Sequence, residues 1–236
     1  MLRDVVAVPE ALERGLEKRV LALWGSVLGV ETGLLDRDGL VVVEDHRDFA
    51  ARRRASIRTA RGTLLLAAPA EKLIAVADPA AYSSDVAARA TGIGLLHYLA
   101  GPYAGGRDPR VRTLGAVDRP LLDALQKAAG VEASEEAEVD VEHPLAVGII
   151  EGGRLLAIAS LLEEGGGAVD VGVLVDPAAR RHRLGVAVVC DIAERASRSE
   201  RLVQYRSNRE NEASARLART CGFTLWGVLT IASQPD

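Results

Sequence analysis

The stretch VGVLVDPAARRHRLGVA, residues 171–187, joins a valine-rich run to a segment with helical periodicity. The run predicts a strand over 171–175, and the apolar spacing at Val189, Ile192, Ala193 and Ala196 predicts a helix from about 184. The turn between them carries four consecutive basic residues: Arg180, Arg181, His182 and Arg183. Unpaired amides and the positive end of a helix attract anions, so this turn can be a phosphate socket. An arginine-rich bend without a ligand is the equally weighted alternative.

Around this stretch the sequence from 111 onward alternates clearly between strands and helices. Residues 144–150, 154–163 and 168–177 are strand-like and are separated by EGG and GGG, which predicts an antiparallel meander. Asp118 as N-cap, Pro120 in the first turn and Gly130 at the end predict a helix between 118 and 130. Further strands are expected at 111–117, 201–206 and 223–232, an exposed helix or loop at 131–143, and a helix that Gly222 ends.

The sequence before residue 105 predicts a smaller α/β region. We expect a helix over 9–30 with Pro9 in its first turn and a strand at 39–45. Two strands split around Pro69 are expected in 63–78, and a helix over 84–100 with Ser84 as N-cap. The glycines and prolines of 101–110 indicate a junction, which gives domains at 1–105 and 111–236.

Composition narrows the classes of partner. The formal charge of −4 and a pI of about 5.7 give no reason to expect a nucleic acid or an anionic membrane. The five arginines of 51–61 fit a solvated helix face better than a nucleic-acid patch, which would show salt-dependent DNA affinity. No signal peptide or bilayer-length apolar run is present, so a cytoplasmic location is expected. Cys190 and Cys221 are expected to be buried thiols, and the four histidines show no metal-ligand spacing.

Two segments together resemble the GNAT superfamily of acyl-CoA-dependent N-acetyltransferases, in a subgroup with an extra N-terminal region. That family has a V-x-P turn followed by a Q/R-x-x-G-x-G/A loop, matched here by Val175, Pro177, Arg180 and Gly185, with Arg183 where glycine is usual. Residues 207–223 resemble the family segment N-x-x-A/S-x-x-L-Y-x-x-x-G-F, with alanine in place of tyrosine.

The resemblance implies an α/β fold with a mixed, mostly antiparallel GNAT-type sheet flanked by helices, and acetyl-CoA as cosubstrate. Gly185 is expected where the loop meets the helix, close to the CoA phosphates. The residues that the resemblance implies at the CoA site are Val173 and Val175 for the pantetheine arm, Arg180, Arg181, His182, Arg183, Leu184, Gly185, Val186 and Ala187 for the pyrophosphate, and Asn211.

The resemblance also implies transfer of an acetyl group to an amine of unknown identity, with a small molecule or a peptide as the acceptor. The chemistry needs a base or a water relay, and Glu163, Glu164 and Asp170 lie near the strands that usually supply it. Ala218 occupies the position of the family's usual acid, and Tyr205 is a substitute candidate. No residue is assigned as catalytic and no metal is expected. The alternative is a catalytically impaired GNAT-like module that acts through protein contacts, and a homodimer is left open.

Overall fold

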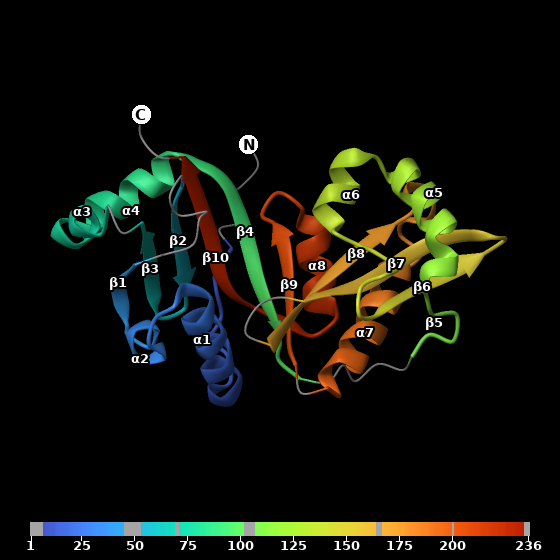
Figure 1. The fold of residues 1–236 in the computed structure, drawn as a ribbon, viewed down its shortest axis with the longest axis horizontal. Coiled ribbons are helices and arrows are strands. Elements are labelled where there is room, and N and C mark those ends of the chain that lie inside the picture. The colour runs from blue at the N-terminus through green and yellow to red at the C-terminus, as the bar shows by residue number, and fades with distance from the viewer. Residues whose placement is uncertain are drawn as a thin grey trace. The chain divides into compact units, whose positions relative to one another are not determined.

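The computed structural model describes residues 7–44, 53–68, 71–101, 107–163, 167–199 and 201–233, and they divide into two compact units (Figure 1). Unit 1 comprises residues 1–100, 206–215 and 224–236, and unit 2 comprises 101–205 and 216–223. Unit 1 therefore includes two segments, 206–215 and 224–236, that follow the junction expected at 101–110. Residues 102–106 of that junction lie outside the described ranges.

Unit 1 is an α/β unit whose sheet has the strand order β1-β3-β2-β10-β4. β1 and β3 are parallel, whereas β3 with β2 and β2 with β10 are antiparallel. The helices and strands are α1 (Arg14–Leu28), α2 (Thr32–Leu35), β1 (Gly39–Glu44), β2 (Arg53–Thr59), β3 (Gly62–Ala67), α3 (Lys72–Ala77), α4 (Pro79–Ala88), β4 (Ala90–Leu99) and β10 (Phe223–Ser233). The last strand of the chain thus completes the sheet of the N-terminal residues.

Three expectations for the N-terminal region were wrong. The arginine-rich stretch is strand β2, and Arg54 is buried there in ion pairs with Glu71 and Asp85. The second apolar run after Pro69 is helix α3, because a short apolar run fits either kind of element. The helix expected over 84–100 is helix α4 followed by strand β4.

The starts of two of these helices also differ from the expectation. α4 begins at Pro79, after an N-cap at Asp78 whose carboxylate accepts from the Ala81 amide at 2.9 Å. The expected cap at Ser84 therefore lies inside the helix. α1 begins at Arg14, where the Glu13 carboxylate accepts from the amides of the first turn, and Pro9 precedes the helix. In both cases a carboxylate defines the helix start.

Unit 2 follows the order predicted from the sequence. Its sheet has the strand order β9-β8-β7-β6-β5, and β9 and α8 also contribute residues to unit 1. The elements are β5 (Arg112–Thr113), α5 (Arg119–Ala129), α6 (Val131–Ala137), β6 (Ala146–Glu151), β7 (Arg154–Glu163), β8 (Ala168–Val175), α7 (Leu184–Ser197), β9 (Leu202–Asn208) and α8 (Glu212–Thr220). Asp118 precedes α5 but its carboxylate accepts from the Gly115 amide and Arg112 rather than capping α5.

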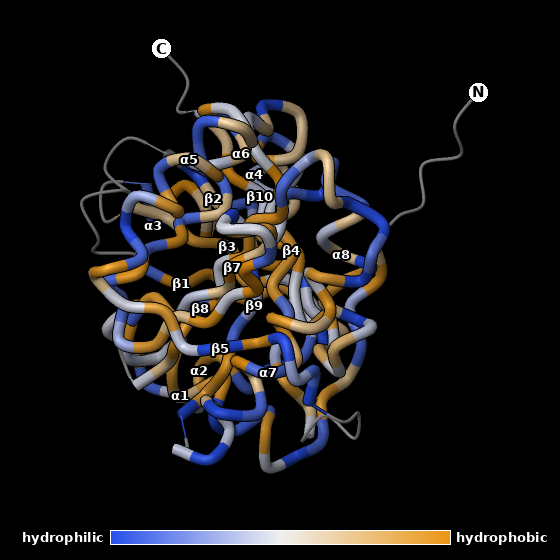
Figure 2. Tube along the Cα trace, turned by 90° about the vertical axis from the view of Figure 1, so that its right-hand side faces the viewer, coloured by the Kyte–Doolittle hydropathy of each residue, from blue (hydrophilic) through white to orange (hydrophobic). Residues whose placement is uncertain are grey.

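The predicted meander is confirmed: β6 with β7 and β7 with β8 are antiparallel. Gly152 and Gly153 both have positive φ, at 56° and 74°, which a tight hairpin turn requires. In Figure 1, α5 and α6 lie on one side of strands β6 to β8 and α7 lies on the other. Figure 2 shows hydrophobic residues along the strands and hydrophilic residues on many outer loops. The sheet of unit 2 is therefore covered on both faces.

The backbone at the end of α6 packs directly against Gly172 in β8. A Cβ on Gly172 would lie 2.2 Å from the carbonyl oxygen of Ala137, where the chain leaves α6. We expect Gly172→Ala to lower the free energy of unfolding by about 2 kcal/mol, because a backbone atom cannot yield as a side-chain end can. Urea denaturation measures this. Gly94→Ala in β4 is the matched control, since its Cβ would meet nothing nearer than 4.0 Å. Equal stability of the two variants would contradict the prediction.

Candidate functional site

Strands β8 and β9 are paired only at their beginnings. Their parallel register comprises Ala168 with Leu202, Val169 with Val203 and Asp170 with Gln204, and the described residues include no further pair. On its other edge, β8 stays paired with β7 as far as Val175. The edge of β8 that faces β9 is therefore without ladder partners from Val171 onward.

The register shows which backbone groups occupy this open edge. The Asp176 amide donates to the Leu156 carbonyl at 2.9 Å, so Asp176 turns its backbone toward β7. Successive residues of a strand direct their N–H and C=O groups to alternate edges. Leu174 and Gly172 consequently face β7, while Val171, Val173 and Val175 face the open edge. The backbone groups of Val173 and Val175 thus lie on the open edge, and their predicted binding to the pantetheine arm stays a prediction.

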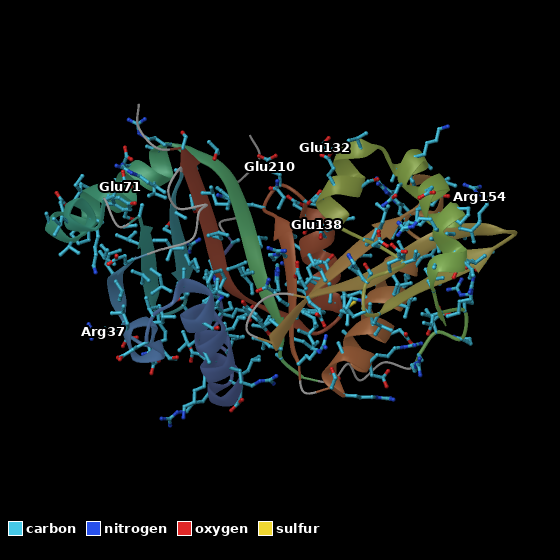
Figure 3. All side chains as sticks on the ribbon, viewed as in Figure 1. Arg37, Glu71, Glu132, Glu138, Arg154 and Glu210 are labelled. Carbon is cyan, nitrogen blue, oxygen red and sulfur yellow. The ribbon has the colours of Figure 1, made fainter. Side chains whose placement is uncertain are left out.

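The turn after β8 is held by a buried carboxylate. Asp176 is 4% exposed, and its side chain accepts from the Ala178 amide at 2.9 Å and from Arg154 at 2.6 Å. Arg154 is the first residue of β7 and is labelled in Figure 3. This pair fixes where the chain leaves the sheet toward α7. Sequence reasoning missed it, although an aspartate directly before Pro177 is a turn signal.

The basic turn carries side chains without acidic partners. Among the described residues, no hydrogen bond or ion pair engages the side chains of Arg180, Arg181, His182 and Arg183, and all four are exposed. By contrast, Arg107, Arg110 and Arg154 in the same unit each pair with a carboxylate. The turn therefore concentrates uncompensated positive charge at one point, which favours an anionic ligand.

Two of these arginines have an unusual backbone. Arg181 and Arg183 have positive φ, at 69° and 58°, in the left-handed region that favours glycine. The glycine that the GNAT motif usually has at the position of Arg183 fits this conformation without strain. The loop thus keeps the backbone path that a glycine would take, and the arginine side chain is added to it.

The first turn of α7 has amides available for an anion. The first helical bond runs from the Ala187 amide to the Arg183 carbonyl at 3.0 Å, and no side chain caps the helix. The amides of Leu184, Gly185 and Val186 precede that bond, so the helix itself supplies them with no acceptor. Together with the positive end of a 14-residue helix, these amides are the kind of donors that an anion site needs, and the anion binding expected from the sequence stays a prediction.

Gly185 has a packing role as well as an amide. A Cβ on Gly185 would lie 3.3 Å from Leu217 Cδ2 and 3.4 Å from Val175 Cγ2, so its side-chain direction points at these apolar groups. Gly185 lies where the loop meets the helix, as the sequence predicts, and its closeness to the CoA phosphates stays a prediction. The missing side chain lets α7 pack closely on its neighbours.

We expect Gly185→Ala to change the free energy of unfolding by less than about 1 kcal/mol, because its methyl meets only flexible side-chain ends and alanine favours the helix. Gly185→Glu should cost about 2 kcal/mol, since it places a carboxylate against Leu217 and Val175. Thermal and urea denaturation of both variants check this. A fully stable Gly185→Glu protein would contradict the packing role.

A pocket of about 310 Å³ lies along α7 between Val186 and Glu194 and reaches the basic turn. Buried Asp191 forms ion pairs with Arg107 at 2.7 Å and with Arg195 at 2.6 Å. The hydrogen bond from Arg107 to Asp191 raises the pKa of the Arg107 guanidinium. The hydrogen bond from Arg110 lowers the pKa of the Asp108 carboxyl. The lining residues are Arg107, Asp108, Arg110, His182, Arg183, Val186, Ala187, Cys190, Asp191 and Glu194. No sequence signal indicates that 107–110 lie beside α7.

The three candidate bases separate by environment. The Glu163 side chain is 59% exposed and pairs with Arg201 at 3.0 Å, as a solvated hairpin carboxylate would. Asp170 is 6% exposed and lies in the last β8–β9 pair, next to the open edge. Glu164 lies outside the described residues. Asp170 is therefore the carboxylate that the fold places where the two strands part.

The remaining predicted residues have structural roles. Tyr205 is 1% exposed and its ring centroid lies 5.5 Å from that of Phe223, so it is a fully buried residue of the sheet. Ala218 is completely buried. The Asn211 side chain in unit 1 accepts from the Ser214 amide at 3.0 Å and so caps α8. The CoA contact expected of Asn211 stays a prediction.

Comparison with known proteins supports the fold. Neither a family model nor a curated protein matches the sequence. Among solved structures, a putative GNAT-family acetyltransferase from Novosphingobium aromaticivorans is 20% identical, with a TM-score of 0.50 over 61% of this chain and 66% of that one. This chain thus spans just under two thirds of that protein. A GNAT-family acetyltransferase from Colwellia psychrerythraea is 12% identical, with a TM-score of 0.53 over 94% of this chain and 74% of that one. The chain has the fold of GNAT-family acetyltransferases.

No helix in the described ranges has both the length and the apolar character that a bilayer span requires.

Proposed function

We propose that this protein transfers the acetyl group of acetyl-CoA to an amine on a small molecule or a peptide. The observation that carries the proposal is the basic turn at 180–183, whose unpaired side chains adjoin the uncapped start of α7. A pyrophosphate there would receive hydrogen bonds from the helix amides and from arginine side chains. This is the chemistry that the phosphate end of acetyl-CoA needs.

The open edge of β8 suits the next part of the same ligand. The pantetheine arm contains amide groups, which can pair with the backbone groups of Val173 and Val175 as a further strand would. The thioester supplies the activated acetyl group, and the acceptor amine must lose a proton as it attacks. Asp170, in the last pair before the strands part, is the residue that we expect to accept this proton, directly or through a water molecule.

The alternative function is a catalytically impaired GNAT-like module that acts through protein contacts. Ala218, at the position of the family's acid, and the arginine side chain at 183 both favour it. In this alternative the Arg183 side chain crosses the phosphate site and blocks it. In the favoured function it binds the phosphates from the side, in keeping with its charge and its exposed position.

Calorimetric titration with acetyl-CoA tests the proposal. At a ligand concentration about 100 times the dissociation constant, binding stabilises the protein by about 2.7 kcal/mol, or roughly 5 to 10 °C in Tm for a chain of this size. Release of free CoA thiol in the presence of an amine panel then measures transfer. Neither heat nor a Tm shift at millimolar acetyl-CoA, with both restored by Arg183→Gly, would show that the module is blocked and would overturn the proposal.

A further inference from the structure

The only two cysteines of the chain lie in contact with each other in unit 2. Cys190 is in α7, and Cys221 directly follows α8. Their sulfur atoms share a hydrogen bond at 2.9 Å, and both are free thiols. The sequence predicts two buried thiols, which is confirmed, but a separation of 31 residues gives no reason to expect contact. The fold therefore makes a dithiol from two unrelated segments.

The two thiols differ in their access to solvent. Cys190 is 5% exposed and lines the pocket beside α7, whereas Cys221 is completely buried behind it. The hydrogen bond with Cys190 and burial raise the pKa of the Cys221 thiol, so the Cys221 thiol resists ionisation. Of the two cysteines, a molecule that enters the pocket can therefore contact Cys190 but not Cys221.

The pocket also suits attack by a thiolate. Its lining includes the acids Asp108, Asp191 and Glu194, and Asp191 pairs with Arg107. The exposed Arg183 side chain also lines the pocket, and a cationic side chain near a thiol favours the thiolate, which is the reactive form. The pocket of about 310 Å³ has room for a small hydroperoxide. A thiolate that lines a pocket and has a second cysteine nearby can oxidise reversibly.

We propose that Cys190 and Cys221 are a peroxide-oxidised pair, in which Cys190 reacts first and Cys221 resolves it. The Cys190 thiolate attacks one oxygen of a hydroperoxide, the O–O bond breaks, and the leaving oxygen takes up a proton from solvent, which gives Cys190 sulfenic acid and an alcohol, or water from hydrogen peroxide. The Cys221 thiol then attacks the Cys190 sulfur, forming the disulfide and releasing water. The hydroperoxide is reduced by two electrons and the two thiols are oxidised by two.

The disulfide would link two segments that already pack together. A Cβ on Gly185 at the start of α7 would lie 3.3 Å from Leu217 Cδ2 in α8, and Cys221 Sγ lies 3.8 Å from the Val186 carbonyl oxygen. A disulfide between Cys190 and Cys221 closes a loop of 31 residues and so lowers the conformational entropy of the unfolded chain. The folded chain needs no rearrangement of α7 and α8 to form it. We therefore expect the oxidised protein to have a Tm about 5 °C or more above that of the reduced protein.

The experiment treats the full chain with hydrogen peroxide under native conditions and follows its intact mass and its disulfide peptides. The expected result is loss of two hydrogen atoms, a peptide that joins Cys190 to Cys221, and reversal by dithiothreitol. Absence of this peptide under peroxide that oxidises free glutathione would overturn the proposal.

Two matched variants test the order of reaction. Dimedone, which captures sulfenic acids, should label Cys190 in Cys221→Ser after peroxide treatment. It should leave Cys190→Ser unlabelled, because Cys221 is completely buried. Labelling of Cys221 in place of Cys190 would overturn the assigned roles. Circular dichroism establishes that each variant is folded, and none of these readouts depends on acetyl-CoA.

Discussion

Replacing both Arg181 and Arg183 by glutamate is expected to raise the dissociation constant for acetyl-CoA at least about 100-fold. Each arginine is exposed and has no acidic partner among the described residues, so its charge is available to a ligand. A hydrogen bond to a charged group contributes about 1.5–3 kcal/mol, and the loss of two corresponds to a factor of 100 or more. Isothermal titration calorimetry at one fixed salt concentration measures the change.

A double variant with the same charge change elsewhere in the unit controls for long-range repulsion. Arg198 lies just after the C-terminal end of α7, and Arg201 precedes β9, where it pairs with Glu163. Glutamate at both of these positions alters the net charge equally but leaves the basic turn intact. It should change the dissociation constant less than about threefold, because exposed charges at a distance are screened. Equal losses in the two double variants would show a general charge effect and would contradict the assigned site.

The fold of residues 111–236 could be predicted largely from local signals. Pro120 and Gly130 mark a helix that the structure places at Arg119–Ala129, and the glycines at 152 and 153 mark the hairpin between β6 and β7. Gly222 ends α8 with a positive φ of 88°. In each case a residue with a restricted or unusually permissive backbone sits at the boundary, so a short window of sequence is sufficient.

The N-terminal region lacked such signals at its decisive positions. KLIAVA in α3 is a short apolar run that fits a strand equally well, yet Leu73 is 82% exposed on the folded helix. The burial of Arg54 depends on Glu71, the N-cap residue of α3, and on Asp85 in α4. β2 also needs β10, from the far end of the chain, as its partner. These contacts are long-range, and a periodicity argument contains no information about them.

The loop of the candidate site could be predicted from the sequence, whereas the open edge of β8 and the ion pair that holds the turn could not. The basic turn and the start of α7 lie where the motif places them, since a strand, a turn and a helix are local features. The open edge of β8 depends on where pairing with β9 stops. The ion pair between Asp176 and Arg154 joins residues that are 22 positions apart in the sequence. Both follow from the register of the sheet, which one segment of sequence cannot determine.

Replacing Asp170 by asparagine is expected to lower kcat for acetyl transfer roughly 100-fold or more while leaving the dissociation constant for acetyl-CoA unchanged. A positioned general base contributes on the order of 10²–10⁴ to the rate, and asparagine keeps the shape of the side chain but cannot accept the proton. In the proposed function the basic turn and the start of α7 bind the phosphate end of acetyl-CoA. The substitution should therefore change kcat without changing the dissociation constant for acetyl-CoA. Steady-state kinetics across pH, together with calorimetry, measure both.

The control is Glu163→Gln, which removes the exposed candidate carboxylate on the neighbouring strand. Glu163 pairs with Arg201 and is largely solvated, so this variant should retain kcat within about twofold. In the parent protein, kcat should fall at low pH as the base becomes protonated, and Asp170→Asn should lose that limb of the profile. A full rate with an unchanged pH profile in Asp170→Asn, or a large loss in Glu163→Gln, would assign the proton to a different acceptor. A rate loss in Asp170→Asn with a matching fall in Tm would instead indicate that buried Asp170 supports the sheet where β8 and β9 part.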